Sequence, residues 1–394
     1  MLNSLPKRPP DKIIKLIQEF RDDPRDRKLD LGVGVYRDAS GITPIMRAVK
    51  TAEKRLWETE STKTYTGMVG EAAFRHAMVR LVLGRNAPFD RIASASAPGG
   101  TGAIHQGLEL VKEGSPNARI WVPDPSWPNH RSMAAHLGFD VEFYRYFDFE
   151  NRNADFDGMC EDLSGVSRGD VVILHGCCHN PTGADLNRGQ WFKLADLLLE
   201  REAVALVDIA YQGFGDGLDE DATGVRHLAS RLPEMLVAAS CSKNFGIYRE
   251  RTGVLLAMSE QASVAGSVQG TLTHLNRQNF SFPPDHGSRL VTMVLEDGEL
   301  RSEWEAELAE IRDNLRMLRS MLASELHQRT GSDRFGFVAE HRGMFSLMGA
   351  SPEQVNAIRE KFGIYMVGDG RVNVAGLSKD TVPMLADALV SAGI

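Results

Sequence analysis

From about residue 92, the chain alternates short β-rich runs with stretches of helical character, and this order constrains its fold more than any other feature. Parallel strands joined by crossover helices have this pattern, so the sequence predicts an α/β fold. The expected strands are residues 91–97, 119–123, 141–147, 171–176, 203–210, 235–240 and 253–259. Several are apolar throughout, which is typical of strands that a sheet buries on both faces.

The C-terminal part of the chain follows a different pattern. Apolar residues recur at spacings of three and four from Glu299 to Gln328, which predicts one long amphipathic helix. Because a helix, two short strands and a final helix are expected after it, we place a domain boundary inside the long helix and a smaller domain at the C-terminal end. The residues before Asp11 have no periodicity and are expected to form an extended arm; they include Pro6, Pro9 and Pro10.

Composition narrows the class of protein. The 394 residues include 45 Lys and Arg against 53 Asp and Glu, so the net charge is −8 and nucleic acid is not an expected partner. The longest apolar stretches, near 171–178 and 235–241, are shorter than the roughly 18–20 residues that span a bilayer. Prolines and charges occupy the N-terminal region where a signal peptide is apolar, so we expect a cytoplasmic protein with reduced cysteines.

Segments of small and polar residues follow several of the expected strands. In open α/β sheets, ligands bind in the crevice beyond the carboxyl ends of the strands, so a site is expected among these segments. They are residues 98–103, 124–130, 177–183, 211–217 and 241–246.

Lys243 is the candidate reactive group, because it follows a buried strand directly and lies among small residues. A lysine amine with an ordinary pKa near ~10.4 is mostly protonated at neutral pH and attacks a carbonyl only after desolvation or neighbouring cations lower that pKa. Most lysines lie on the surface, but this position at a strand end favours a catalytic role.

Asp208 ends an apolar run, where an unpaired carboxylate is costly, so it needs a cationic or hydrogen-bonding partner. The protonated pyridine nitrogen of pyridoxal 5′-phosphate is such a partner, and the acid keeps that ring an electron sink. A helix cap or a structural arginine is an equal alternative for Asp208 alone. Tyr211, nearby in sequence, adds a hydroxyl group.

The segment PGGTGA at 98–103 places backbone amides at the start of an expected helix, which is typical of an anion site. It matches neither the dinucleotide-binding nor the P-loop pattern. A tight turn without a ligand is the alternative. Thr101, Ser240 and Arg251 as further phosphate donors favour the anion site.

Two arginines and one tryptophan have open interpretations. Arg277 and Arg371 are the pair that a dicarboxylate substrate requires, although each alone is as well explained by a surface ion pair. Trp127 is either a core aromatic residue or a flat surface for a planar cofactor.

A metal site is the weaker interpretation of the segment HGCCHNPTG. His175, Cys177, Cys178 and His179 are metal-ligand types, but a second ligand pair at ordinary spacing is missing from the sequence. Asn180 and the residues after it fit a rigid turn better. We therefore expect no metal.

Together these segments resemble the class I pyridoxal phosphate aminotransferases of fold type I, in particular the aspartate and bacterial aromatic-amino-acid aminotransferases. The resemblance covers nearly the whole chain, from LGVGVYRD (31–38) and TKTYTGMVG (62–70) through SCSKNFG (240–246) to GRVNVAG (370–376). It implies a large domain with a mainly parallel sheet flanked by helices, and a smaller α/β domain. The implied limits are 1–11 for the arm, 12–44 with 311–394 for the small domain and 45–310 for the large cofactor-binding domain.

The resemblance implies roles for residues of the large domain. Lys243 is implied to be the Schiff-base lysine and proton shuttle, and Asp208 to hold the pyridine nitrogen with His130 behind it. The residues implied to contact the rest of the cofactor are Asn180 and Tyr211 at the phenolic oxygen, Trp127 on the ring, and Gly100, Thr101, Ser240 and Arg251 at the phosphate.

The resemblance also implies a homodimer with shared active sites. Tyr65 matches the tyrosine that reaches the phosphate of the neighbouring subunit, and Arg277 matches the arginine that binds the distal carboxylate there. Arg371 is implied to bind the substrate α-carboxylate, and Gly34 to contact the substrate. Aspartate aminotransferases commonly read S-N-P-P where this chain has Ser281-Phe282-Pro283-Pro284, so a more apolar distal pocket is expected.

The expected activity is therefore ping-pong transfer of an amino group from phenylalanine, tyrosine, tryptophan or aspartate to 2-oxoglutarate. A strict aspartate aminotransferase is the main alternative. A pyridoxal phosphate lyase or decarboxylase is less favoured, because Arg277 and Arg371 together favour transamination. A ligand-sensing domain of a transcription regulator is disfavoured, because the chain has no room for a basic DNA-binding module.

Overall fold

The computed structural model describes residues 2–7 and 11–394. The chain consists of two compact units: unit 1 is Met1–Thr43 with Leu315–Ile394, and unit 2 is Pro44–Asn314. In the predicted arm, Leu2–Ser4 form a short 3₁₀ helix instead of extended chain. Pro9 and Pro10 of that arm lie outside the described residues.

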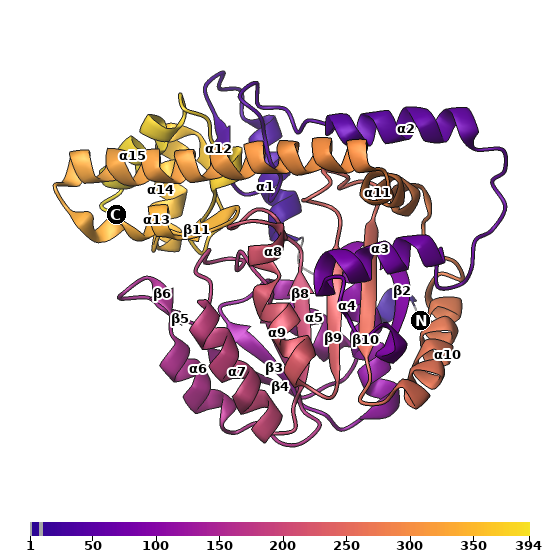
Figure 1. Ribbon diagram of the computed structural model, residues 1–394. Coiled ribbons are helices and arrows are strands. Elements are labelled where there is room, and N and C mark those ends of the chain that lie inside the picture. Colours follow the sequence, from indigo (N-terminus) through magenta and orange to yellow (C-terminus); the bar gives the residue numbers. More distant parts are fainter. Residues whose placement is uncertain (1, 8–10) are drawn as a thin grey trace. The chain divides into compact units, whose positions relative to one another are not determined.

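Among the described residues, unit 2 is built around a seven-stranded sheet in the order β2-β10-β9-β8-β7-β3-β4 (Figure 1). Each predicted run contains a strand. The strands are β2 (Ile92–Pro98), β3 (Ile120–Asp124), β4 (Val141–Arg145), β7 (Val171–His175), β8 (Val204–Ile209), β9 (Met235–Ser240) and β10 (Thr252–Met258). The run at 141–147 also contributes β5 (Phe147–Asp148), which pairs with β6 (Asn153–Ala154).

The sheet is parallel from β4 to β9, but β10 runs antiparallel to both of its neighbours, β9 and β2. The prediction of parallel strands is therefore wrong for β10. The reason is the short connection 241–251 between β9 and β10, because a parallel crossover needs roughly a dozen or more residues and usually a helix.

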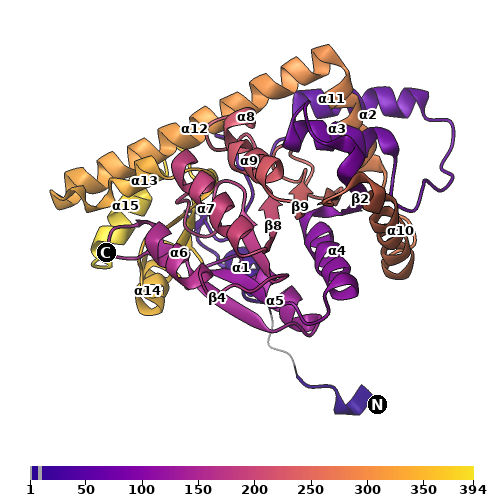
Figure 2. The same cartoon turned by 60° about the horizontal axis from the view of Figure 1, so that its bottom comes forward.

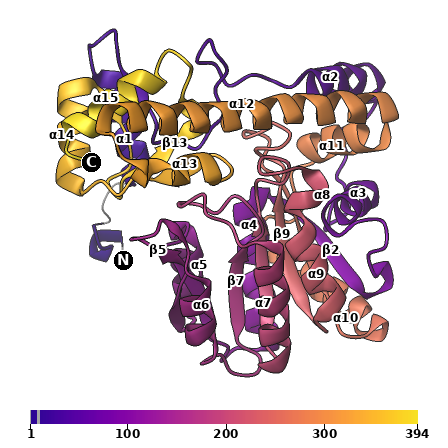
Figure 3. The same cartoon turned by 60° about the vertical axis from the view of Figure 1, so that its left-hand side comes forward.

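Helices cover both faces of this sheet, as Figures 2 and 3 show, with α4 and α5 on the opposite side from α7 and α9. In α4, the buried residues Ile104, Leu108 and Val111 recur at spacings of four and three and pack into the core of the sheet. The helices of unit 2 are α2 (Arg47–Thr59), α3 (Ala72–Leu83), α4 (Gly99–Gly114), α5 (Pro128–His136), α6 (Phe156–Leu163), α7 (Arg188–Glu200), α8 (Leu218–Asp221), α9 (Thr223–Arg231), α10 (Ala262–Asn279), α11 (His286–Glu296), the 3₁₀ helix η2 (Phe89–Arg91) and the first half of α12 (Gly298–Thr330).

The predicted long helix is confirmed as α12, and the boundary between the two units lies inside it. The remaining elements of unit 1 are α1 (Lys12–Asp22), β1 (Leu29–Asp30), the 3₁₀ helix η3 (Asp333–Phe335), α13 (Phe337–Glu340), β11 (Phe345–Leu347), α14 (Pro352–Phe362), β12 (Ile364–Tyr365), β13 (Arg371–Asn373), the 3₁₀ helix η4 (Val374–Gly376) and α15 (Val382–Ser391). β1 pairs in parallel with β12, and β11 pairs antiparallel with β13.

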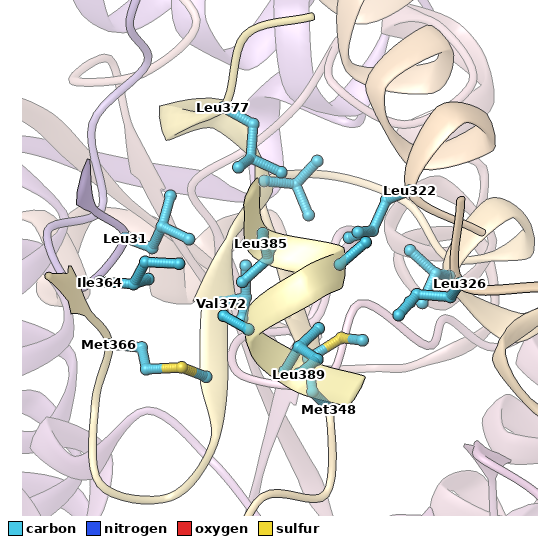
Figure 4. Close-up of a cluster of buried hydrophobic side chains, with 14 of the residues drawn as sticks. Leu31, Leu322, Leu326, Met348, Ile364, Met366, Val372, Leu377, Leu385 and Leu389 are labelled. Atoms are coloured by element: carbon cyan, nitrogen blue, oxygen red, sulfur yellow. The ribbon is translucent and has the colours of Figure 1, made fainter. Parts of the chain in front are cut away.

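Unit 1 has its own hydrophobic core, shown in Figure 4. Leu322 and Leu326 at the end of α12 pack with Leu385 and Leu389 of α15 and with Val372 of β13. Along each helix the two leucines are four residues apart, so they lie on one face. This packing fixes the short strand that begins with Arg371. No helix in the described part of the chain is long and apolar enough to cross a membrane.

Candidate active site

The predicted site segments of unit 2 meet at one edge of the sheet. His175 at the end of β7 pairs with Asp208 of β8, which pairs with Ala238 of β9. Beyond β9 in the sheet, Gly253 of β10 pairs with Ser240 of β9 and with Ala97 of β2. The residues that follow β7, β8, β9 and β2, and those that precede β10, therefore lie at the same edge.

Lys243 lies on the loop between β9 and β10. Its Nζ atom is 5.0 Å from the centre of the Tyr211 ring. Burial lowers the pKa of Lys243; the positive charge of Arg251 acts in the same direction, and the negative charge of Asp208 opposes it. A larger fraction of the Lys243 amine is therefore neutral than for an ordinary lysine.

Asp208 has one satisfied and one unsatisfied oxygen. Its Oδ2 lies 3.0 Å from Nε2 of His130, whereas its buried Oδ1 has no hydrogen-bond partner among the described residues. Burial is the largest single influence and raises the pKa of this carboxyl, but the hydrogen bond from His130 and the further electrostatic interactions with its neighbours, including Lys243, together outweigh it, and the net pKa is lowered. Asp208 is therefore an ionised, buried carboxylate with room for one more donor.

A chain of hydrogen bonds supports Asp208 from behind. His130 is fully buried, its Nδ1 lies 2.9 Å from Ser126 Oγ, and that oxygen lies 3.1 Å from Nε2 of His175. Burial and the neighbouring histidines lower the pKa of His175 well below its ordinary value, so its ring is neutral. The sequence pattern did not single out Ser126 and indicated His175 only as a metal ligand; Ser126 lies before α5 begins, so no helical spacing connects it with His130.

The glycines after β2 bring backbone close to side chains from β9 and β10. Gly99 has φ +71°, and a Cβ there would lie 2.5 Å from Nη2 of Arg251. A Cβ on Gly100 would lie 3.0 Å from Cβ of Ser240. Because the first amides of α4 have no partners within the helix, this corner combines free N–H groups, a hydroxyl and an arginine, which suits an anion. Thr101 lies in the same first turn and is exposed.

Two further predicted residues lie at the same edge of the sheet. Trp127 is half-buried and meets the His130 ring edge to face, with ring centroids 5.3 Å apart. Asn180 follows β7 and is buried. Both therefore lie at the carboxyl edge of the sheet, on the connections after β3 and β7.

The segment 175–179 does not gather into the ligand set considered for a metal. Among the described residues, Cys177 and Cys178 lie close to Asp221 instead. One ligand atom of each of these three residues lies within 4.8 Å of the other two. The oxygens of Asp221 accept N–H groups from the turn at 213–216, so this carboxylate closes a loop. His179 instead contacts Thr182 Oγ1 at 2.8 Å.

Tyr65 and Arg277 are exposed and lie away from the Lys243 group. The Tyr65 ring stacks on Phe282, and Arg277 Nη1 donates to Ser281 Oγ at 2.6 Å. Within the described chain, neither side chain forms a hydrogen bond or ring contact with the residues around Lys243.

Gly34 and Arg371 belong to unit 1 and share one neighbour, Phe345. The Arg371 guanidinium lies 4.4 Å from the centre of the Phe345 ring, and its Nη2 donates to the carbonyl of Gly32 at 3.0 Å. A Cβ on Gly34 would lie 2.9 Å from Cζ of Phe345. Asn373 Nδ2 donates to the carbonyls of Val33 and Val35, which fixes the chain on either side of Gly34. Neither Phe345 nor Asn373 could be assigned to this site from the sequence, because no local pattern connects them to residue 34.

Comparison with known proteins identifies the family. Residues 26–389 match the family "aminotransferase class I and II". The chain is 56% identical to the aromatic-amino-acid aminotransferase of Paracoccus denitrificans over the full length of both, and 40% identical to the aspartate aminotransferase of Escherichia coli K12 over 99% of this chain and 100% of that one. A solved structure of an aromatic amino acid aminotransferase with 3-indolebutyric acid matches with a TM-score of 0.98, 56% identity and full coverage of both chains. The chain therefore belongs to the class I and II aminotransferases.

Family membership confirms three predictions: the fold type I α/β class, an enzyme of the aminotransferase class, and pyridoxal 5′-phosphate as cofactor. A related structure from Burkholderia pseudomallei, 39% identical over 100% of this chain and 99% of that one with a TM-score of 0.97, is an aromatic-amino-acid aminotransferase covalently bound to pyridoxal phosphate.

Proposed function

We propose that this aminotransferase moves the amino group of phenylalanine, tyrosine, tryptophan or aspartate to 2-oxoglutarate, in two half-reactions that share one active site. The observation that carries the chemistry is the ionised carboxylate of Asp208, with one unpaired oxygen, at the same sheet edge as Lys243, whose pKa is lowered. A buried acceptor without a donor is costly, so Asp208 Oδ1 fits a ligand that brings an N–H group.

The residues of unit 2 fit pyridoxal 5′-phosphate. Asp208 Oδ1 would accept the N–H of the protonated pyridine ring, and the amides of the Gly99–Gly100 turn with Ser240 and Arg251 would hold the phosphate. The residues assigned to the remaining contacts are Thr101 at the phosphate, Asn180 and Tyr211 at the phenolic oxygen, Trp127 on the ring face, and Lys243 for the covalent bond.

When bound, the cofactor supplies an electron-withdrawing ring that stabilises negative charge at the substrate α-carbon. Asp208, whose pKa is lowered despite its burial, would hold the proton on the ring nitrogen, with His130 supporting its other oxygen. Lys243 Nζ takes the proton from the α-carbon of the amino acid in one half-reaction and returns a proton to the α-carbon of the new amino acid in the other. The lowered pKa of Lys243 suits this role, because a neutral amine is needed to accept the proton.

Two arginines are assigned to the substrate carboxylates. Arg371 binds the α-carboxylate, with Gly34 beside the substrate; the carbonyl of Gly32 and the ring of Phe345 orient its guanidinium, a group that can bind a carboxylate through two parallel hydrogen bonds. Arg277 binds the distal carboxylate of aspartate or 2-oxoglutarate in the neighbouring subunit, and Tyr65 reaches the phosphate there. The exposure of both side chains in a single chain supports a homodimer with shared sites.

The preference for aromatic side chains has two supports. Relatives 56% and 44% identical to this chain are aromatic-amino-acid aminotransferases, and Phe282 places an aromatic ring close to Arg277 in sequence. A strict aspartate aminotransferase is the second candidate. Its support is the 40% identity of this chain to the aspartate aminotransferase of Escherichia coli. The proposed location is the cytoplasm.

The test is to measure kcat/KM for phenylalanine, tyrosine and aspartate, each with 2-oxoglutarate, on protein reconstituted with pyridoxal 5′-phosphate. Values for an aromatic substrate equal to or above the value for aspartate would establish the proposal. Activity confined to aspartate would establish the second candidate. Release of carbon dioxide or a side-chain fragment without glutamate formation would point to a decarboxylase or a lyase.

A further inference from the structure

The turn that follows α10 contacts two exposed residues, Tyr65 and Arg277, which are assigned above to the active site of the neighbouring subunit. Ser281 has φ +67°, in the left-handed region, and its N–H donates to the carbonyl of Asn276 at 2.8 Å. This conformation reverses the chain directly after α10. As a result, consecutive side chains contact two different groups: the hydroxyl of Ser281 accepts from Arg277, and the ring of Phe282 lies on Tyr65.

Tyr65 lies in a segment without helix or strand, 81% exposed, and its hydroxyl has no partner in the described chain. The end of this segment is firmly attached, because buried Asn276 donates to the carbonyl of Met68 at 2.8 Å and Ser96 N–H donates to that of Val69 at 2.9 Å. Tyr65 itself is three residues before Met68 and lacks such a backbone attachment. What holds its side chain is the Phe282 ring, 4.7 Å away between centroids and tilted by 20°.

A stacked pair of this geometry restricts both torsions of the tyrosine side chain. An exposed tyrosine without the contact would sample several rotamers, and its hydroxyl would occupy the binding position for only part of the time. Stacking of two aromatic rings stabilises one arrangement by an amount equivalent to about two- to tenfold in population.

We infer that Phe282 is a positioning residue for Tyr65: its ring holds the Tyr65 hydroxyl where it binds the cofactor phosphate of the partner subunit. This inference rests on the proposed function, because it assigns the Tyr65 hydroxyl to a phosphate. It differs from the expectation that Phe282 only makes the distal substrate pocket apolar. Under that expectation Phe282 affects the aromatic substrate, whereas under ours it affects cofactor affinity through Tyr65.

The experiment measures the dissociation constant of pyridoxal 5′-phosphate by equilibrium titration of cofactor-depleted dimer. The variants are Tyr65→Phe, Phe282→Leu, Phe282→Trp and the double variant Tyr65→Phe with Phe282→Leu. We expect Phe282→Leu to weaken binding about two- to tenfold, as the stacking estimate indicates, and Phe282→Trp, which retains a flat ring, to bind like the wild type. In the double variant, affinity should equal that of Tyr65→Phe alone, because the leucine then has no hydroxyl left to misplace.

Phe149→Leu is the matched control, since Phe149 is an exposed aromatic residue on a different part of unit 2, and its cofactor affinity should not change. The inference is overturned if Phe282→Leu binds the cofactor like the wild type, if Leu and Trp weaken binding equally, or if the losses in the double variant add. A raised KM for phenylalanine with unchanged cofactor affinity would assign Phe282 to the substrate pocket instead. Failure of the proposed function is distinct, because the wild type itself would then not bind the cofactor or transaminate.

Discussion

Trp304 fixes the backbone next to the reactive lysine, and its replacement gives a quantitative test of this structure. The side chain is fully buried, its Nε1 donates to the carbonyl of Asn244 at 2.7 Å, and its ring stacks on Phe245 at 4.5 Å with an interplanar angle of 6°. Asn244 and Phe245 follow Lys243 directly. The indole therefore holds the two residues that determine where the Lys243 backbone lies.

Trp304→Phe retains a stacked ring but removes the indole N–H, so the Asn244 carbonyl is left buried without its indole partner. An unsatisfied buried polar group costs about 1–3 kcal/mol. The atoms lost from the indole leave a small cavity that adds about 1 kcal/mol. We expect the free energy of unfolding to fall by about 2–4 kcal/mol in total.

The assay is urea denaturation of the cofactor-loaded protein, followed by far-ultraviolet circular dichroism at one fixed protein concentration, because both ligand and subunit association shift the midpoint. Trp57→Phe is the matched control, since Trp57 is 81% exposed in the chain, and a change within about 0.5 kcal/mol is expected there. If Trp304→Phe were no more destabilising than Trp57→Phe, the role assigned to the indole would be wrong.

Three further predictions concern charge and burial. Arg277→Leu should lower kcat/KM for aspartate by about 30-fold or more, the cost of leaving a carboxylate without its arginine, and leave phenylalanine much less affected; equal losses would argue against the assigned role. Native protein treated with iodoacetamide should be labelled at Cys160, which is partly exposed, while the buried cysteines react only after unfolding; mass spectrometry that found Cys241 labelled as fast as Cys160 would contradict this. Burial raises the pKa of Asp185 to about 6. The native state then keeps a proton that the unfolded state releases above about pH 4, so the free energy of unfolding should fall as pH rises through this window, and Asp185→Asn should lessen that slope; parallel urea profiles for the two proteins at different pH would refute it.

The chemistry of the site could be predicted where a polar residue interrupts or directly follows an apolar run. Lys243 and Asp208 are such residues, because a charge at the end of a buried strand needs a partner or a function, and its position there is visible in the sequence. The glycines at 99 and 100 were found for a similar reason, since small residues between a strand and a helix indicate close approach of another group. These signals are local in the chain.

The remaining features depend on the relative placement of strands, which local patterns do not encode. Ser126 meets His175 only because β3 and β7 are neighbours in the sheet. The direction of β10 depends on the length of the loop before it, which the apolar pattern of the strand does not report. Phe345 contacts both Gly34 and Arg371 through pairing of segments far apart in the sequence. Such contacts could not be inferred from spacing.

The antiparallel direction of β10 has a consequence for how proteins of this kind can diverge. Because β9 and β10 are adjacent, Lys243 and Arg251 lie on one short connection, and inserting or deleting a residue there would shift the amine relative to the arginine. The connections at the opposite edge, such as residues 201–203 before β8 and 232–234 before β9, carry none of the residues assigned to the site. Changes of chain length should therefore accumulate at that edge during evolution, while the loop 241–251 keeps its length.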